Sequence, residues 1–199
     1  MVNAAVLVSG GGTNLQALLD AQAAGRMPHV RIALVVASNP QAYALQRAAK
    51  AGVEAVVCAR KAYESAGAHD AALCGLLQSH GIDMVVLAGD LSMIGPRVLA
   101  AYPDKILNIH PSLIPSFCGA GYYGLRVHEA ALAKGVKVTG ATVHLVNEHY
   151  DEGRILAQKA VEVCEGDTPE TLQRRVMEQA EWVILPQAAE RLAQQLEQG

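Results

Sequence analysis

Apolar runs and amphipathic stretches alternate along the first half of the chain, with turns between them. The apolar runs predict strands over residues 4–8, 31–37, 54–58, 83–88 and 105–109. The amphipathic stretches predict helices over residues 14–24, 41–51 and 70–80, and a short one that starts at 94 or 96 and ends at 101. This alternation predicts right-handed crossovers and a parallel sheet with helices on both faces.

The second half of the chain has a different pattern. Residues 110–124 mix prolines, glycines and aromatic residues without a regular period, so we expect a long functional loop there. A helix over 125–134 follows, and then strands over 139–146 and 155–163 on either side of a loop. Thr168 and Pro169 suit the cap and first turn of a C-terminal helix, which Pro186 should kink or split.

Together these elements predict an α/β fold. We expect an open, mostly parallel twisted sheet with helices on both faces, and an antiparallel strand pair toward the C-terminal part. No internal repeat or linker divides the 199 residues, which is an ordinary length for one domain. We therefore predict a single domain over 1–199, in which residues 1–101 and 102–199 share one sheet.

Composition and charge narrow the class of protein. The chain is 51% hydrophobic but has no apolar run long enough to cross a bilayer, and its start lacks the pattern of an export signal, so we expect a cytoplasmic protein. A net charge of −3 argues against a generally basic surface for nucleic acid but allows a local anion pocket. The cysteines lack metal-site spacing and are expected to be free thiols: Cys58, Cys74, Cys118 and Cys164.

A glycine-rich segment, Ser9-Gly10-Gly11-Gly12-Thr13-Asn14, lies where the first strand meets the first helix. Main-chain N–H groups and a helix N-terminus at such a place form an anion site, and glycines let a phosphate approach the backbone. The segment lacks the lysine of a Walker A loop, and Leu15 occupies the place of the third glycine of a dinucleotide fingerprint. Phosphate binding is favoured over NAD binding; the alternative is that the glycines only make a tight turn.

Two further segments carry candidate chemistry. Asn108 and His110 are two residues apart in a strand, so they point to the same side at its carboxyl end, where α/β proteins bind ligands. An amide and an imidazole can stabilise a developing oxyanion, although each alone is more often a structural polar group. Asp151 lies in an acidic loop that is usually just solvated; it gains a role only if the fold brings it against His110.

These segments, in this order and spacing, resemble the glycinamide ribonucleotide formyltransferases over nearly the whole chain. The resemblance also includes Leu87-Ala88-Gly89, Gly140-Ala141-Thr142-Val143-His144 and Asp151-Glu152-Gly153. The string from Asn108 to Pro115 is shared by the wider folate-dependent formyltransferase group, so it indicates the reaction class rather than the substrate. The resemblance implies a Rossmann-like formyltransferase fold, with a phosphate-binding half over 1–101 and a catalytic and folate-binding half over 102–199.

The resemblance also implies an activity: transfer of a formyl group from 10-formyltetrahydrofolate to the amine of glycinamide ribonucleotide, in de novo purine biosynthesis, without a metal. It implies catalytic roles for Asn108, His110 and Asp151. The residues implied to bind the ribonucleotide are Gly11, Gly12, Thr13, Asn14 and Glu181. The residues implied to bind the folate are Leu91, Ser92, Met93, Ile94, Thr142, Val143 and His144. The expected partners are these small molecules, without nucleic acid or membrane, and the expected state is a monomer or homodimer.

Some positions depart from the family pattern and leave an alternative open. The segment after Gly89 begins with Asp90, and Ser65 to Ala68 lack an arginine that many members carry. The alternative is a non-catalytic nucleotide-binding or regulatory relative that has lost folate binding. Methionyl-tRNA formyltransferases and formyltetrahydrofolate hydrolases share the mechanism, but each adds a domain for which we expect no space in 199 residues.

Overall fold

A seven-stranded sheet forms the centre of the molecule. The computed structural model describes residues 1–89 and 94–198. The strands are β1 (Val2–Val8), β2 (Val30–Ala37), β3 (Glu54–Val57), β4 (Met84–Leu87), β5 (Ile106–His110), β6 (Val138–Leu145) and β7 (Ile155–Glu162). The helices are α1 (Thr13–Ala23), α2 (Ala44–Lys50), α3 (Ala66–Ser79), α4 (Pro96–Ala101), α5 (Leu125–Lys134), α6 (Pro169–Val176) and α7 (Trp182–Gln198). A 3-10 turn, Arg60–Ala62, and a π-helical segment, Met177–Glu181, complete them.

The strand order is β3-β2-β1-β4-β5-β6-β7, so strands from both halves of the chain share one sheet. The first five strands in this order pair in parallel, whereas β6 is antiparallel to β5 and β7 is antiparallel to β6. This arrangement confirms the predicted fold class, including the antiparallel pair toward the C-terminal part.

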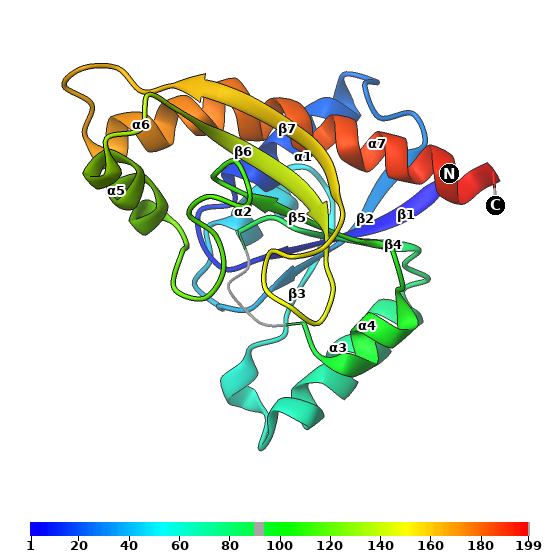
Figure 1. Ribbon diagram of the computed structural model, residues 1–199. Coiled ribbons are helices and arrows are strands. Elements are labelled where there is room, and N and C mark those ends of the chain that lie inside the picture. The colour runs from blue at the N-terminus through cyan, green and yellow to red at the C-terminus, as the bar shows by residue number, and fades with distance from the viewer. Residues whose placement is uncertain (90–93, 199) are drawn as a thin grey trace.

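Alternate residues of the central strands enter two separate cores, one on each face of the sheet. In β1, Val6 and Val8 pack with α1, α6 and α7, whereas Ala5 and Leu7 pack on the opposite face with α3 and α4. Figure 1 shows these two groups of helices on opposite sides of the sheet. Because both faces are covered, the strands need apolar residues at nearly every position, which explains why they appear as apolar runs in the sequence.

The helical cover changes at β5. Ile106 belongs to the core beneath α3 and α4, and Asn108 and His110 continue the same face of the strand by alternation. Asn108 lies opposite His144 and His110 lies opposite Thr142 in the antiparallel pairing with β6. Loops, including parts of 119–124 and 146–151, contribute to the wall over this part of the sheet. Polar side chains can therefore face a cavity here.

Three predicted boundaries or breaks differ from the structure by more than two residues. α3 starts at Ala66 instead of residue 70, because the Ser65 hydroxyl caps it by accepting the N–H of Ala68 at 3.0 Å. α2 starts at Ala44, because a turn at Asn39 occupies the residues before it. The C-terminal helix is interrupted at the π-helical segment ahead of Pro186, and Pro186 itself lies inside α7.

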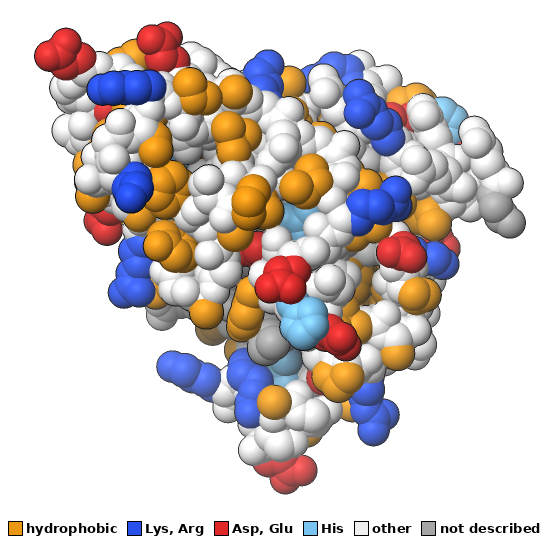
Figure 2. Space-filling model, in the orientation of Figure 1, with side chains coloured by type: hydrophobic (Ala, Val, Ile, Leu, Met, Phe, Trp, Pro, Cys, Tyr) orange, Lys and Arg blue, Asp and Glu red, His pale blue; other side chains and the backbone are white. Residues whose placement is uncertain are grey.

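The cysteines, the surface charge and the length of the helices do not point to a particular function. The four cysteines are free, as predicted. On the face shown in Figure 2, basic side chains are spread between acidic and apolar ones. Within the described residues, no helix is both long enough and apolar enough to cross a membrane.

Candidate active site

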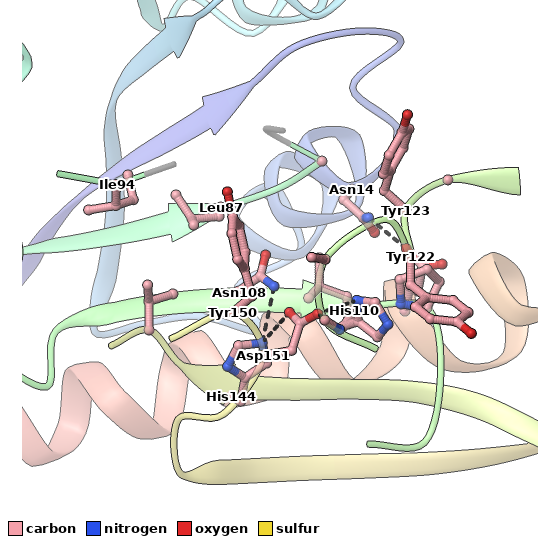
Figure 3. Close-up of a pocket in the computed structure, with 18 of the residues that line it drawn as sticks. Asn14, Leu87, Ile94, Asn108, His110, Tyr122, Tyr123, His144, Tyr150 and Asp151 are labelled. Atoms are coloured by element: carbon pink, nitrogen blue, oxygen red, sulfur yellow. Dashed lines mark hydrogen bonds and ion pairs between the residues drawn. The ribbon is translucent and has the colours of Figure 1, made fainter. Parts of the chain in front are cut away.

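A cavity of about 600 Å³ opens at the carboxyl ends of β4 and β5 (Figure 3). One wall comes from β5 and β6, and two loops, 119–124 and 146–151, close much of the rest. The far end reaches Asn14 at the start of α1 and Glu181 at the end of the π-helical segment. The volume lies within the ordinary range for sites that bind small molecules.

His110 is buried in this wall between two oxygen atoms. Its Nε2 donates to the Phe117 carbonyl at 2.9 Å, and its Nδ1 lies 3.5 Å from Oδ2 of Asp151. Burial lowers the pKa of His110, although the Asp151 carboxylate and the Phe117 carbonyl act in the opposite direction. Burial therefore outweighs the contact with Asp151. Only the protonated ring can donate to both oxygens, so added negative charge nearby would favour that form.

Asp151 reaches His110 from the loop between β6 and β7. Its backbone has φ 56°, in the left-handed region that aspartate tolerates better than most residues, and a Cβ at Gly153 would overlap the Leu145 carbonyl group. The main-chain N–H of Gly119 donates to Asp151 Oδ2 at 2.8 Å. Burial raises the pKa of Asp151, but the contact with His144, the charge of His110 and this N–H together hold it below its usual value. The carboxylate is therefore present at neutral pH.

His144 lies between the amide and the carboxylate of the site. Its Nδ1 donates to the Leu145 carbonyl at 2.8 Å. Its Nε2 is 3.1 Å from Nδ2 of Asn108 and 3.4 Å from Oδ1 of Asp151. The resemblance had placed His144 with the folate-binding residues, and the structure places it between two of the predicted catalytic side chains as well as in the cavity wall (Figure 3). Pairing of β5 with β6 produces this contact.

Asn14 and Glu181 line the other end of the cavity, whereas Gly11, Gly12 and Thr13, in the turn that precedes Asn14, are not among the lining residues. Gly12 has φ 71° and precedes α1 without a side chain to cap it, so the first N–H groups of the helix lack that partner. Asn14 lines the cavity, and its Nδ2 donates to Glu181 Oε2 at 2.7 Å. Burial raises the pKa of Glu181 to about 7, although the Asn14 bond opposes it. Gly11 is exposed at the surface and Thr13 is half-buried.

The predicted folate-binding residues divide into three groups. Ile94 lines the cavity. Leu91, Ser92 and Met93 lie outside the described residues. Val143 points into the core on the opposite face of the sheet, and the fully buried Thr142 hydroxyl donates to the Ser112 carbonyl at 2.7 Å. Neither Thr142 nor Val143 lines the cavity. Alternation along β6 directs Val143 to the core, and the 110–124 loop covers Thr142.

Three tyrosines in the cavity wall had no individual role in our sequence interpretation. Tyr122 and Tyr123 belong to the irregular 110–124 loop, and Tyr150 precedes Asp151. The Tyr122 ring lies 6.4 Å from that of Phe117, and the Arg126 guanidinium lies 4.9 Å from the Tyr123 ring centre. Aromatic residues among the glycines of the loop were the signal that could have identified two of them.

Comparison with known proteins shows the family of this chain. The family described as "Formyl transferase" matches residues 2–188. The chain belongs to the formyl transferase family. Within this family, the chloroplastic phosphoribosylglycinamide formyltransferase of Arabidopsis thaliana is 41% identical over 174 residues, which are 87% of this chain and 59% of the relative. The phosphoribosylglycinamide formyltransferase of Haemophilus influenzae is 39% identical, over 94% of this chain and 84% of that protein.

A solved structure of the family has the same fold. The glycinamide ribonucleotide transformylase 1 of Symbiobacterium toebii superposes with a TM-score of 0.92 at 47% identity, over 98% of this chain and 89% of that chain. The predicted resemblance to glycinamide ribonucleotide formyltransferases is therefore confirmed in sequence and fold. The chain spans less than two thirds of some family relatives: 59% of the Arabidopsis protein and 18% of the Bos taurus trifunctional purine biosynthetic protein adenosine-3.

Proposed function

We propose that this chain transfers a formyl group from 10-formyltetrahydrofolate to the amine of glycinamide ribonucleotide, as a step of de novo purine biosynthesis. The observation that carries the proposal is the convergence of Asn108, His110 and Asp151 on one wall of a cavity whose far end reaches the start of α1. Membership of the formyl transferase family and the printed names of the relatives support the same reaction.

In the proposed reaction, the substrate amine attacks the formyl carbon, a new carbon–nitrogen bond forms, and the bond to the folate nitrogen breaks. Negative charge develops on the formyl oxygen during the attack. Asn108 Nδ2 is the donor proposed to meet this oxygen, and the positive charge of a protonated His110, whose two ring nitrogens face Phe117 and Asp151, is proposed to stabilise it. Because burial keeps the resting imidazole mainly neutral, the developing charge itself would favour the protonated ring.

Asp151 is proposed to work through His110 and to move a proton. Its carboxylate faces Nδ1 of His110 at 3.5 Å, so it stabilises the imidazolium. The attacking amine must lose a proton and the leaving folate nitrogen must gain one, and Asp151 is the group proposed to relay it, through water. His144 Nε2 lies 3.1 Å from Asn108 Nδ2 and 3.4 Å from Asp151 Oδ1, so the ring packs between these two side chains and fixes their spacing. Preorganised polar groups and two bound substrates account for catalysis in this scheme.

The ribonucleotide is proposed to bind at the α1 end of the cavity. Main-chain N–H groups of Gly11, Gly12 and Thr13 would hold the phosphate, together with Asn14, because unpaired N–H groups at a helix start attract anions. Glu181 lines the same end and would reach the glycinamide part of the substrate.

The formyl folate is proposed to bind at the opposite end. The folate supplies the formyl carbon and the leaving nitrogen. Leu87, Ile94 and Val146 give this end apolar lining, which fits a flat aromatic ring. The proposed folate-binding set keeps Leu91, Ser92 and Met93, and from the segment 142–144 it keeps His144, which lines the cavity.

Three broader features stay predictions. They are a single domain over 1–199, a cytoplasmic location, and a monomeric or homodimeric state. In the ranges 1–89 and 94–198, no cluster of three or more His, Cys, Asp or Glu side chains is arranged to hold a metal ion.

The proposal is tested by mixing the purified chain with 10-formyltetrahydrofolate and glycinamide ribonucleotide and following formylated nucleotide by mass spectrometry. We expect steady turnover that Asn108→Ala nearly abolishes. Calorimetry with each substrate alone distinguishes the alternative: ribonucleotide binding without folate binding and without product would show a non-catalytic nucleotide-binding protein and would overturn the proposed reaction.

A further inference from the structure

The start of α2 packs against the glycine turn. The main-chain N–H of Ala44 donates to the Gly10 carbonyl at 3.2 Å, and Nε of Arg47 donates to the Gly11 carbonyl at 2.8 Å. Two successive carbonyl groups of the turn are therefore held by one helix. Neither residue was singled out by the sequence, because both α1 and β2 lie between the turn and α2 in the chain.

These two bonds determine where the next N–H groups point. In a trans peptide, the carbonyl of one residue and the N–H of the following residue point in opposite directions. Since the Gly10 and Gly11 carbonyls point toward α2, the N–H groups of Gly11 and Gly12 point away from it. Two adjacent N–H groups that point the same way form an anion-binding concavity.

Arg47 is itself held firmly. Its Nη1 donates to Oε1 of Gln16 on α1 at 2.9 Å, and its guanidinium carbon lies 5.1 Å from the centre of the Tyr43 ring. The side chain is half-buried, so it bridges α1, α2 and the turn in one geometry. A lysine has a single charged nitrogen and could not reproduce these directed bonds.

The contact between the turn and α2 leaves no space for a side chain. A Cβ at Gly12 would lie 2.6 Å from Cβ of Ala44 and 3.4 Å from Cδ of Arg47. The turn is therefore held by close packing on one side and by hydrogen bonds along the same side. A Cβ built at Gly10 or Gly11, by contrast, would meet no atom within 4 Å.

We propose that Arg47 is a positioning residue for the phosphate site: it holds the glycine turn so that the Gly11 and Gly12 N–H groups face the phosphate of the substrate. This inference rests on the proposed function, in which the turn binds the phosphate of a ribonucleotide. The proposed role is geometric: Arg47 acts through its directed hydrogen bonds to the turn and to Gln16.

The test compares a phosphorylated and a dephosphorylated acceptor, glycinamide ribonucleotide and glycinamide riboside. In Arg47→Met, we expect kcat/KM for the ribonucleotide to fall about tenfold, the strength of one charge-assisted hydrogen bond. The value for the riboside and the KM for the folate should change less than about twofold, because neither uses the phosphate site. Equal losses with both acceptors, or no loss with the ribonucleotide, would overturn the inference.

Two variants separate geometry from charge. Arg47→Lys keeps the charge but lacks the directed bonds, so we expect it to behave like Arg47→Met. Activity near that of the wild type would mean that charge alone acts and would refute positioning.

Arg26→Met is the matched control, because Arg26 lines a cavity of about 240 Å³ with Arg47 but forms no side-chain hydrogen bond to the turn among the described residues. Its kinetics should be unchanged.

A binding measurement keeps the inference separate from the proposed reaction. Inorganic phosphate is titrated into the wild type and Arg47→Lys, and main-chain N–H shifts of Gly11 and Gly12 are followed by NMR. Weaker binding in the variant, with altered shifts at these two groups, supports the inference whether or not formyl transfer occurs. Equal affinity with equal shifts overturns it. Absence of turnover in the wild type overturns the proposed reaction alone.

Discussion

At the α1 end of the cavity the phosphate site would be made mainly of main-chain groups, whereas at the β5 end the polar groups are side chains. The glycine turn presents N–H groups of consecutive residues, and α2 holds it from behind. Asn108, His110 and His144 lie on adjacent strands, and Asp151 arrives from a loop after β6. The first end depends on backbone conformation and the second on the identity and contacts of side chains.

This difference predicts opposite responses to mutation. A change of side chain that keeps the backbone should harm the β5 end most, because donors and charges disappear there. A change that alters backbone conformation should harm the α1 end most. Glu181 is the exception at that end, since its contribution comes from a buried carboxyl group.

The largest expected effect comes from removing a donor at the β5 end. Asn108→Ala and His110→Ala should each lower turnover by about two to three orders of magnitude, because each removes a group aimed at the developing oxyanion. Steady-state kinetics measures the loss, and circular dichroism with thermal unfolding verifies that the fold is intact. Turnover that stays within a few-fold of the wild type in either variant would show that the residue is not catalytic.

A second effect concerns the buried carboxyl group of the α1 end. Burial raises the pKa of Glu181 to about 7, above its ordinary value of 4.5. Between pH 4.5 and about pH 7, Glu181 keeps its proton in the folded chain but has released it in the unfolded chain. The free energy of unfolding therefore falls as pH rises through this range and then levels off. At about 1.4 kcal/mol per pKa unit, the loss is about 3 kcal/mol.

Urea unfolding at pH 5 and pH 8 measures this loss. Glu181→Gln resembles the protonated acid and should lack this part of the pH dependence, so the wild type should lose more free energy of unfolding than the variant between the two pH values. Parallel pH dependence in both proteins would contradict an elevated pKa for Glu181.

Asp151→Asn should have the next largest effect. The amide keeps the shape but removes the charge that faces His110 at 3.5 Å, so turnover should fall about 30-fold while the Kd for the ribonucleotide changes little. Single-turnover kinetics and calorimetry separate the two quantities. A variant with weakened ribonucleotide affinity and normal turnover would argue that Asp151 binds substrate instead.

The smallest effect tests the backbone of the α1 end. Gly12→Ala places a Cβ 2.6 Å from Cβ of Ala44 at a residue with φ 71°, so the turn must shift. We expect KM for the ribonucleotide to rise about tenfold with turnover less affected, because the N–H groups lose their direction. Gly10→Ala is the control, since a Cβ there meets no atom within 4 Å. Equal KM values for the two variants would show that the conformation of Gly12 is unimportant.

Much of the fold followed from the chain alone because its signals are local. Apolar runs predicted the five strands of the parallel part, of which the central ones are buried on both faces, and the two strands predicted after residue 134 are also present. Errors arose where a local detail mattered more than the period, as at Ser65, whose hydroxyl starts α3 four residues early. The break in the C-terminal helix was predicted at Pro186, but the structure has it earlier, at the π-helical segment Met177–Glu181.

The sequence by itself determined the order of elements, the glycine turn at the start of α1, and the shared direction of Asn108 and His110. Each depends on residues close together in the chain and on the two-residue period of a strand. Only the tertiary structure brought Asp151 against His110, placed His144 between Asn108 and Asp151, and joined Arg47 to the glycine turn. Those contacts depend on strand order, on the register of β5 with β6 and on turn geometry, which arise from packing of the whole chain.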